Sequence, residues 1–130
     1  MSQELPKDRR DFPRIETEHS VEVVDADGNV FPTLALDLSL TGMQLLCDGP
    51  TAERIAPGGA VTTDGQPREL ALRLRVRLHE AGRQLIGVRC QVMSLREVQA
   101  DEFRIGVRFM RFDGDSYHAL EAYIDESLPD

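Results

Sequence analysis

A strict two-residue alternation of apolar and polar side chains, present in two stretches, constrains the fold of this chain most strongly. In "ELALRLRVRL", residues 69–78, every second residue is leucine or valine, and arginine fills three of the positions between them. In "TLALDLSL", residues 33–40, leucine again recurs at every second position. Because successive side chains of a β-strand point to opposite faces, this period predicts two half-buried strands and argues against helices there.

The alternation also predicts which side chains face the core. For residues 33–40 the predicted inward set is Leu34, Leu36, Leu38 and Leu40, and the predicted outward set is Thr33, Ala35, Asp37 and Ser39. For residues 69–78 the predicted inward set is Leu70, Leu72, Leu74, Val76 and Leu78, and Arg73, Arg75 and Arg77 face outward. Each strand therefore presents one apolar face to a core and one polar face to solvent.

Shorter patterns predict further strands and one helix. Val21 and Val23 alternate with polar residues before Asp27-Gly28, a strong hairpin turn signal. "MQLLCD", "QLIGVRCQVMSL" and "FRIGVRFMRF" are predicted strands, and residues 48–68, rich in glycine and proline, are a predicted irregular connection. The apolar residues of the tail recur at helical spacing after three candidate capping residues: Tyr117, Leu120, Ile124 and Leu128, after Asp113, Asp115 and Ser116. The pattern predicts a mainly β fold, a small antiparallel barrel or sandwich closed by a C-terminal helix.

The chain of 130 residues fits one domain. Residues 1–13 are polar and contain two prolines, which predicts a flexible N-terminal segment before a folded part at residues 14–130. The net charge of -8 argues against a general nucleic-acid-binding protein, which usually carries a basic surface. Absence of a membrane-length apolar run and of a signal-peptide pattern predicts a cytoplasmic protein without membrane insertion.

No residue pattern points to an enzyme or to a metal site. Cys47 and Cys90 lie far apart in the sequence, and the three histidines lack metal-ligand spacing. The chain contains no nucleophile elbow, paired-histidine motif or phosphate-binding Walker loop. We therefore expect a protein that is not an enzyme and that has no cofactor.

Two short motifs carry the functional signal. "RRDFPR", residues 9–14, gathers three arginines in an acidic chain, and "DLSLTG", residues 37–42, combines a carboxylate, a hydroxyl and a glycine. A carboxylate can accept hydrogen bonds from the N1–H and the amino group of guanine. Arginine guanidinium groups pair with phosphates and stack on purine faces. Together the two motifs have the groups needed to hold a guanine nucleotide, whereas the arginines alone would indicate a solvated tail that pairs with Asp8 and Asp11.

The two motifs, in this order, resemble the signature of the PilZ domain family. That pattern is an arginine, three variable residues and a second arginine, followed later by Asp or Asn, any residue, Ser, two variable residues and Gly. Arg10 and Arg14 match the first part, and Asp37, Ser39 and Gly42 match the second. "IGVRF", residues 105–109, is similar to the closing barrel strand of the family, so the resemblance covers roughly residues 9–127.

The resemblance implies a six-stranded antiparallel β-barrel that binds the bacterial second messenger cyclic di-GMP. In this reading Arg10 and Arg14 clasp guanines and phosphates, Asp37 and Ser39 bond a guanine edge, and Gly42 keeps a turn tight beneath the ligand. Arg9 implies a stacked pair of ligand molecules. The N-terminal arginine segment would become ordered on binding and change the surface shown to an unidentified protein partner, in control of motility, adhesion or biofilm.

Two alternatives remain open from the sequence. One is a PilZ-like module that docks a protein of pilus or polysaccharide assembly without binding nucleotide, although family members of that kind usually lack the arginine motif. The other is an oligonucleotide-binding barrel, which would use basic grooves and exposed aromatic side chains for stacking. The chain has no tryptophan, 5% aromatic residues and the wrong sign of charge for that class.

Overall fold

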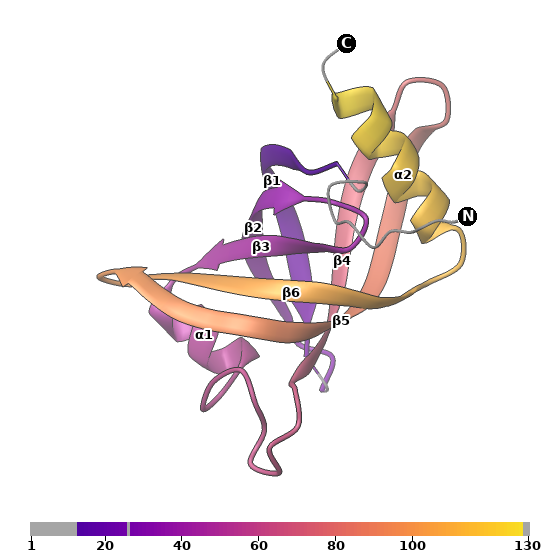
Figure 1. Cartoon of the computed structure of the whole chain (residues 1–130). Helices are drawn as coiled ribbons and strands as arrows, with labels where there is room; N and C mark the ends of the chain where they lie inside the picture. The colour runs from indigo at the N-terminus through magenta and orange to yellow at the C-terminus, as the bar shows by residue number, and fades with distance from the viewer. Residues whose placement is uncertain (1–12, 26, 129–130) are drawn as a thin grey trace, which may run out of the picture.

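Six antiparallel strands close into a barrel in the computed structural model, which describes residues 13–25 and 27–128 (Figure 1). The strands are β1 (Ile15–Val24), β2 (Val30–Leu38), β3 (Gly42–Cys47), β4 (Glu69–Leu78), β5 (Gly82–Gln99) and β6 (Glu102–Phe112). Around the ring they follow the order β1-β2-β3-β6-β5-β4, and β4 pairs with β1 to close it. This architecture confirms the predicted mainly β fold with a C-terminal helix.

Strand β4 has the faces that its alternation predicts. All five inward positions, from Leu70 to Leu78, are buried in the core, whereas Arg75 and Arg77 are exposed. The core is built mainly from aliphatic residues of all six strands, including Val23, Leu45 and Ile105. Each fully buried aliphatic side chain of this kind contributes roughly 1.5–3 kcal/mol, so the alternating pattern is the main source of stability.

Strand β2 departs from the predicted faces because it contains a β-bulge. Its register with β3 shifts between Ala35 and Asp37, so that Leu36 is an extra residue on β2. Before the bulge the prediction is wrong: Thr33 and Ala35 are buried, and Leu34 is 36% exposed. After the bulge Leu38 is buried as predicted. A bulge re-aims the side chains that follow it, and here it directs Asp37 away from the core.

Helix α1 (Gly49–Ile55) lies within the segment predicted to be an irregular connection. The Asp48 carboxylate accepts a hydrogen bond from the Thr51 N–H at 2.8 Å, and Pro50 occupies the first turn, where its missing N–H costs nothing. Ala52 and Ile55 are buried. The prediction is wrong for this third of the connection, because a capping aspartate and a proline start a short helix there. The rest, up to residue 68, contains no other helix or named strand.

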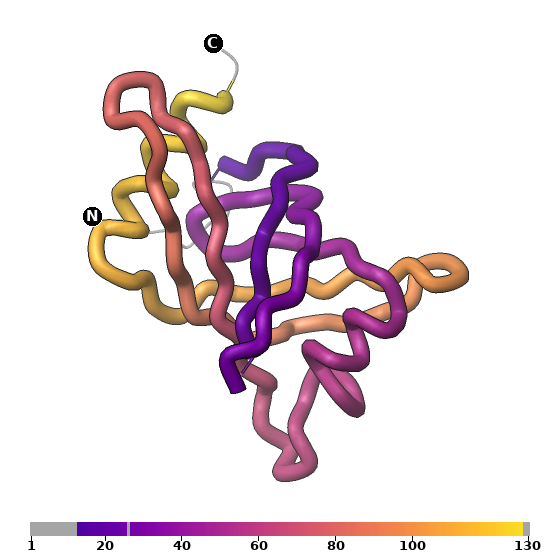
Figure 2. The backbone as a smooth tube through the Cα atoms, turned by 180° about the vertical axis from the view of Figure 1, so that it is seen from behind, coloured from indigo at the N-terminus to yellow at the C-terminus, as the bar shows by residue number. Residues whose placement is uncertain are grey.

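Helix α2 (Ser116–Ser127) packs beside the β4–β5 hairpin and covers one end of the core, while α1 lies at the opposite end (Figures 1 and 2). Leu120 and Ile124 are buried, as their helical spacing predicts. Asp115 is the N-cap residue but makes no side-chain capping bond, and the buried Ser116 hydroxyl instead accepts the Gly87 N–H at 2.9 Å. The helix is therefore fixed by packing and by this bond to β5.

The two cysteine thiols are free and are predicted to be poorly reactive. Burial raises the pKa of Cys90 to about 12 and that of Cys47 to about 11, because an apolar environment disfavours the thiolate. At pH 8 we expect iodoacetamide to label the cysteines of the folded protein far more slowly than those of the urea-unfolded chain. Mass spectrometry measures the labelling rates. Equal labelling rates for the folded and unfolded protein would contradict the burial of Cys90 and the partial burial of Cys47.

Candidate functional site

The two sequence motifs meet at an ion pair. Arg14, just before β1, donates from Nη1 to the Oδ1 atom of Asp37 at 2.7 Å. The same Oδ1 accepts the backbone N–H of Gln44 on β3 at 3.1 Å. Both side chains retain access to solvent, so the pair itself adds only about 0–1 kcal/mol of stability. The ion pair and the bond from Gln44 instead hold the Asp37 carboxylate in a fixed position. Its second oxygen, Oδ2, forms no hydrogen bond with any described residue.

Ser39 lies in the turn that joins β2 to β3, not on the outer face of a strand. Strand β2 ends at Leu38, and Ser39 is only 1% exposed. Its N–H donates to the Gly42 carbonyl at 3.0 Å, and its Oγ accepts the Thr41 N–H at 3.1 Å. The prediction that Asp37 and Ser39 emerge side by side is wrong, because the strand ends between them and the serine hydroxyl turns inward to satisfy the backbone of the turn.

Gly42 allows β3 to approach β6 closely at the start of their pairing. A Cβ atom at this position would lie 2.3 Å from the Val107 carbonyl oxygen, well inside van der Waals contact. Because the obstructing atom belongs to the backbone, no side-chain rotation can make room for it. Gly42 is therefore required by the packing of the turn against β6.

A hollow of about 370 Å³ opens beside the Arg14–Asp37 pair. Its lining combines the pair with residues of β3, β5 and β6: Met43, Gln44, Met93, Gly106 and Val107. Asp37, Gln44, Gly106 and Ser94 form one row across β2, β3, β6 and β5. Because Gly106 has no side chain, only the rotatable Ser94 hydroxyl lies near the centre of this row among the described groups, which leaves room for a ligand.

Sequence reasoning missed these lining residues. Gln44 is two residues beyond Gly42 and so on the same strand face, a signal that was available. Met93 is 57% exposed because a bulge between Val92 and Ser94 leaves it without a partner on β6, and no local pattern indicates that bulge. The hollow depends on strand pairing as much as on the two motifs.

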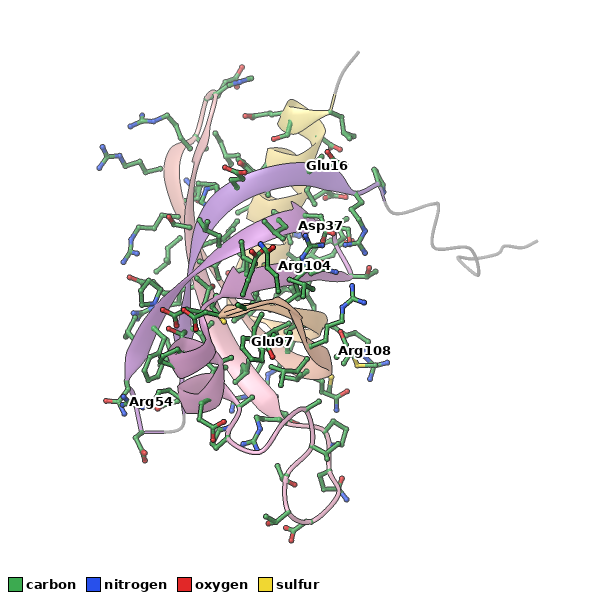
Figure 3. All side chains as sticks on the ribbon, turned by 90° about the vertical axis from the view of Figure 1, so that its left-hand side faces the viewer. Glu16, Asp37, Arg54, Glu97, Arg104 and Arg108 are labelled. Carbon is green, nitrogen blue, oxygen red and sulfur yellow. The ribbon has the colours of Figure 1, made fainter. Side chains whose placement is uncertain are left out.

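Two further arginines lie on this side of the barrel (Figure 3). Arg104 of β6 donates from Nη1 to the Gln44 side-chain oxygen at 3.3 Å, and its Nε is buried without a hydrogen-bond partner among the described residues. Arg108 of β6 is exposed and donates to Gln91 at 2.7 Å. The site thus combines a carboxylate with three guanidinium groups, which suits a ligand bearing both hydrogen-bond donors and negative charge.

Arg9 and Arg10 lie outside the described residues, as does nearly all of the segment predicted to be flexible at residues 1–13. Their predicted roles therefore stay predictions. Of the six predicted site residues, the structure brings Arg14 and Asp37 into contact, places Ser39 in the adjoining turn and places Gly42 at the first position of β3.

Comparison of the sequence with protein families decides the family of this chain. The sequence model of the PilZ domain family matches residues 8–126. The chain belongs to the PilZ domain family. No match is found among curated protein sequences. The extent of the PilZ match includes both motifs, the whole barrel and nearly all of α2.

Solved structures share the fold of this PilZ domain at low sequence identity. The Bacillus subtilis inhibitor of motility MotI/DgrA has a TM-score of 0.63 at 16% identity, over 92% of this chain and 50% of that chain. The PilZ domain of YcgR from Escherichia coli with c-di-GMP has a TM-score of 0.56 at 17% identity, over 92% of both chains. The MrkH–c-di-GMP complex of K. pneumonia has a TM-score of 0.53 at 18% identity, over 92% of this chain and 52% of that one.

The chain spans about half the length of MotI/DgrA and MrkH, so the likeness concerns the PilZ fold alone. Within residues 13–25 and 27–128, no helix has the length and apolar character needed to cross a membrane. The same ranges contain no group of three or more His, Cys, Asp or Glu side chains arranged to hold a metal ion.

Proposed function

We propose that this PilZ domain is a receptor for cyclic di-GMP, without enzymatic activity, that passes its signal to a protein partner. The observation that carries the proposal is the 2.7 Å contact between Arg14 and Asp37 at the edge of an open hollow. Family membership supports it, as do the c-di-GMP complexes among proteins of the same fold.

In the proposed complex the free Oδ2 atom of Asp37 accepts the N1–H and amino group of a guanine. Arg14 lies at the rim, where its guanidinium can pair with a phosphate or stack on a base. Arg104 and Arg108 add positive charge on the same side for the second phosphate. Ser39 and Gly42 act through the turn, which holds Asp37 and Gln44 in position, and not through direct contact.

Arg9 and Arg10 complete the proposal from the N-terminal side. We infer that they close over the ligand from outside the barrel, and that Arg9 favours a stacked pair of ligand molecules. Closure of this segment would change the surface near the start of β1, which is how binding would reach a partner. The alternative of a docking module that binds no nucleotide gains no support from the arginine and aspartate contact, which such a module would not need.

Isothermal titration of the protein with cyclic di-GMP tests the proposal. We expect saturable binding that weakens as the salt concentration rises, because guanidinium groups contact phosphates. Two ligands per chain are expected if Arg9 supports a stacked pair. Cyclic di-AMP is the matched control, since adenine lacks the N1–H donor that Asp37 would bond; equal affinity for both dinucleotides, or no heat with either, would refute the assignment.

A further inference from the structure

Positive charge is concentrated on three strands of this acidic protein. Strands β4, β5 and β6 together hold nine arginines against three glutamates, although the whole chain carries a net charge of -8. The acidic surplus therefore lies on the rest of the molecule. A local excess of one charge on one side of a protein steers molecules of opposite charge to that side.

Several of these arginines face each other directly. Arg77 of β4 is paired with Arg83 of β5 next to the hairpin turn, and both are exposed. Among the described residues neither forms an ion pair, in contrast to Arg73 and Arg75, which contact Glu22 at 3.1 and 3.4 Å. Like charges directly opposite each other destabilise a sheet. The Arg77–Arg83 pair therefore does not stabilise the isolated domain, and its presence needs another explanation.

We define the hairpin face as the outward side of the β4–β5 hairpin: Arg73, Arg75, Arg77, Arg83, Leu85 and Arg89. Leu85 is 54% exposed and lies opposite Arg75, so a large apolar side chain is surrounded by guanidinium groups. Leu85, Arg73 and Gly87 also line a hollow of about 350 Å³, and Asp113 and Asp115 are among its other lining residues. The Nε of Arg73 is buried and has no hydrogen-bond partner among the described residues.

We propose that the hairpin face docks an acidic, extended segment of a protein partner, with carboxylates over the arginines and an apolar side chain beside Leu85. Arginine is enriched at protein interfaces, and the exposed Leu85 side chain offers apolar surface that a partner can bury. A nucleic acid fits less well, because single-stranded nucleic acids bind by stacking their bases on aromatic side chains, and the hairpin face as defined contains none. This surface is separate from the Arg14–Asp37 site, and the inference does not depend on nucleotide binding.

A fluorescein-labelled peptide of alternating glutamate and leucine is the probe for this surface. Fluorescence anisotropy measures its binding to the protein. Alternating glutamate–serine and lysine–leucine peptides separate the charge and apolar contributions, and a labelled oligo-dT strand represents nucleic acid. We expect the glutamate–leucine peptide to bind best, with affinity that falls as salt rises. No binding of this peptide, or tighter binding of oligo-dT, would overturn the proposal.

Arg83→Glu and Arg96→Glu form a matched pair of variants. Both are exposed arginines of β5 that lie opposite another arginine, Arg77 and Arg104 respectively, but only Arg83 belongs to the hairpin face. Each substitution replaces a like-charge pair by an opposite pair, so both are expected to raise Tm by about 1–4 °C. Only Arg83→Glu is expected to weaken peptide binding, by about fivefold or more.

Cyclic di-GMP titration of Arg83→Glu separates this inference from the receptor proposal. Retained nucleotide binding with lost peptide binding supports a separate docking surface. Equal loss of peptide binding in both variants would show that the peptide responds only to the total charge of the protein. Unchanged peptide binding in Arg83→Glu would show that the peptide binds to another face. Either outcome would refute the proposed docking surface. Loss of nucleotide binding in Arg83→Glu would assign this arginine to the nucleotide site and refute a separate surface.

Discussion

Replacing Asp37 by alanine is expected to weaken cyclic di-GMP binding by about 10- to 100-fold, while the domain stays folded. The carboxylate would supply charge-assisted hydrogen bonds to guanine, each with a net contribution of roughly 1.5–3 kcal/mol. The substitution also releases Arg14 from its 2.7 Å contact, so the guanidinium loses its fixed position. Isothermal titration gives the change in affinity, and urea unfolding reports the fold.

Controls distinguish a specific loss from a change in charge. Glu53→Ala removes an exposed carboxylate of α1 that is not among the residues lining the hollow, and should leave affinity within twofold. Asp37→Asn should bind more tightly than Asp37→Ala, because the amide oxygen still accepts one hydrogen bond. Arg14→Lys should bind less tightly than the parent, since an ammonium cannot reproduce the planar fork of arginine. Wild-type affinity in Asp37→Ala would remove the basis of the proposed function.

Replacing Gly42 by alanine is expected to lower the free energy of unfolding by about 3 kcal/mol, at the upper end of the usual cost of overpacking. The added Cβ would lie 2.3 Å from the Val107 carbonyl oxygen, so β3 and β6 would have to separate where their pairing begins. The adjoining turn hydrogen bond from Ser39 N–H to the Gly42 carbonyl would be strained as well. Urea denaturation monitored by circular dichroism measures the loss.

Gly106→Ala is the comparison for this prediction. A Cβ there would meet the Ser94 Oγ at 2.7 Å, but that atom ends a side chain that can rotate away. We therefore expect a smaller loss of stability than for Gly42→Ala, together with weaker nucleotide binding, because the new methyl group enters the hollow. If Gly42→Ala proves as stable as the parent, the close approach of β3 and β6 is not the reason for glycine at this position.

Much of the fold was predictable because its main signal is local. The alternation in β4 places five side chains in the core without reference to any other strand, and the spacing of Leu120 and Ile124 identifies the buried face of α2. The Asp27-Gly28 turn is equally local: Gly28 adopts a positive φ of 86°, and the Asp25 carboxylate accepts the N–H groups of Asp27 and Asn29.

Helix α1 shows where local signals were available and were not used. Asp48 and Pro50 mark a helix start in the sequence, yet the glycines and prolines around them favoured an irregular connection. The lining of the hollow shows the opposite case. Met93 and Gly106 lie on strands far along the chain from Asp37, and only the pairing of β3 with β6 and of β6 with β5 brings them to the same site.

The sequence by itself determined the strand content, the buried faces of β4 and α2, and the two motifs that hold Arg14 and Asp37. Only the tertiary structure decided that Thr33 and Ala35 face the core ahead of a bulge at Leu36, that the Ser39 hydroxyl closes a turn, and that Gly42 permits contact with β6. The physical reason is the range of the interactions. Side-chain period is a property of one strand, whereas register, bulges and close backbone approach depend on the strand that pairs with it.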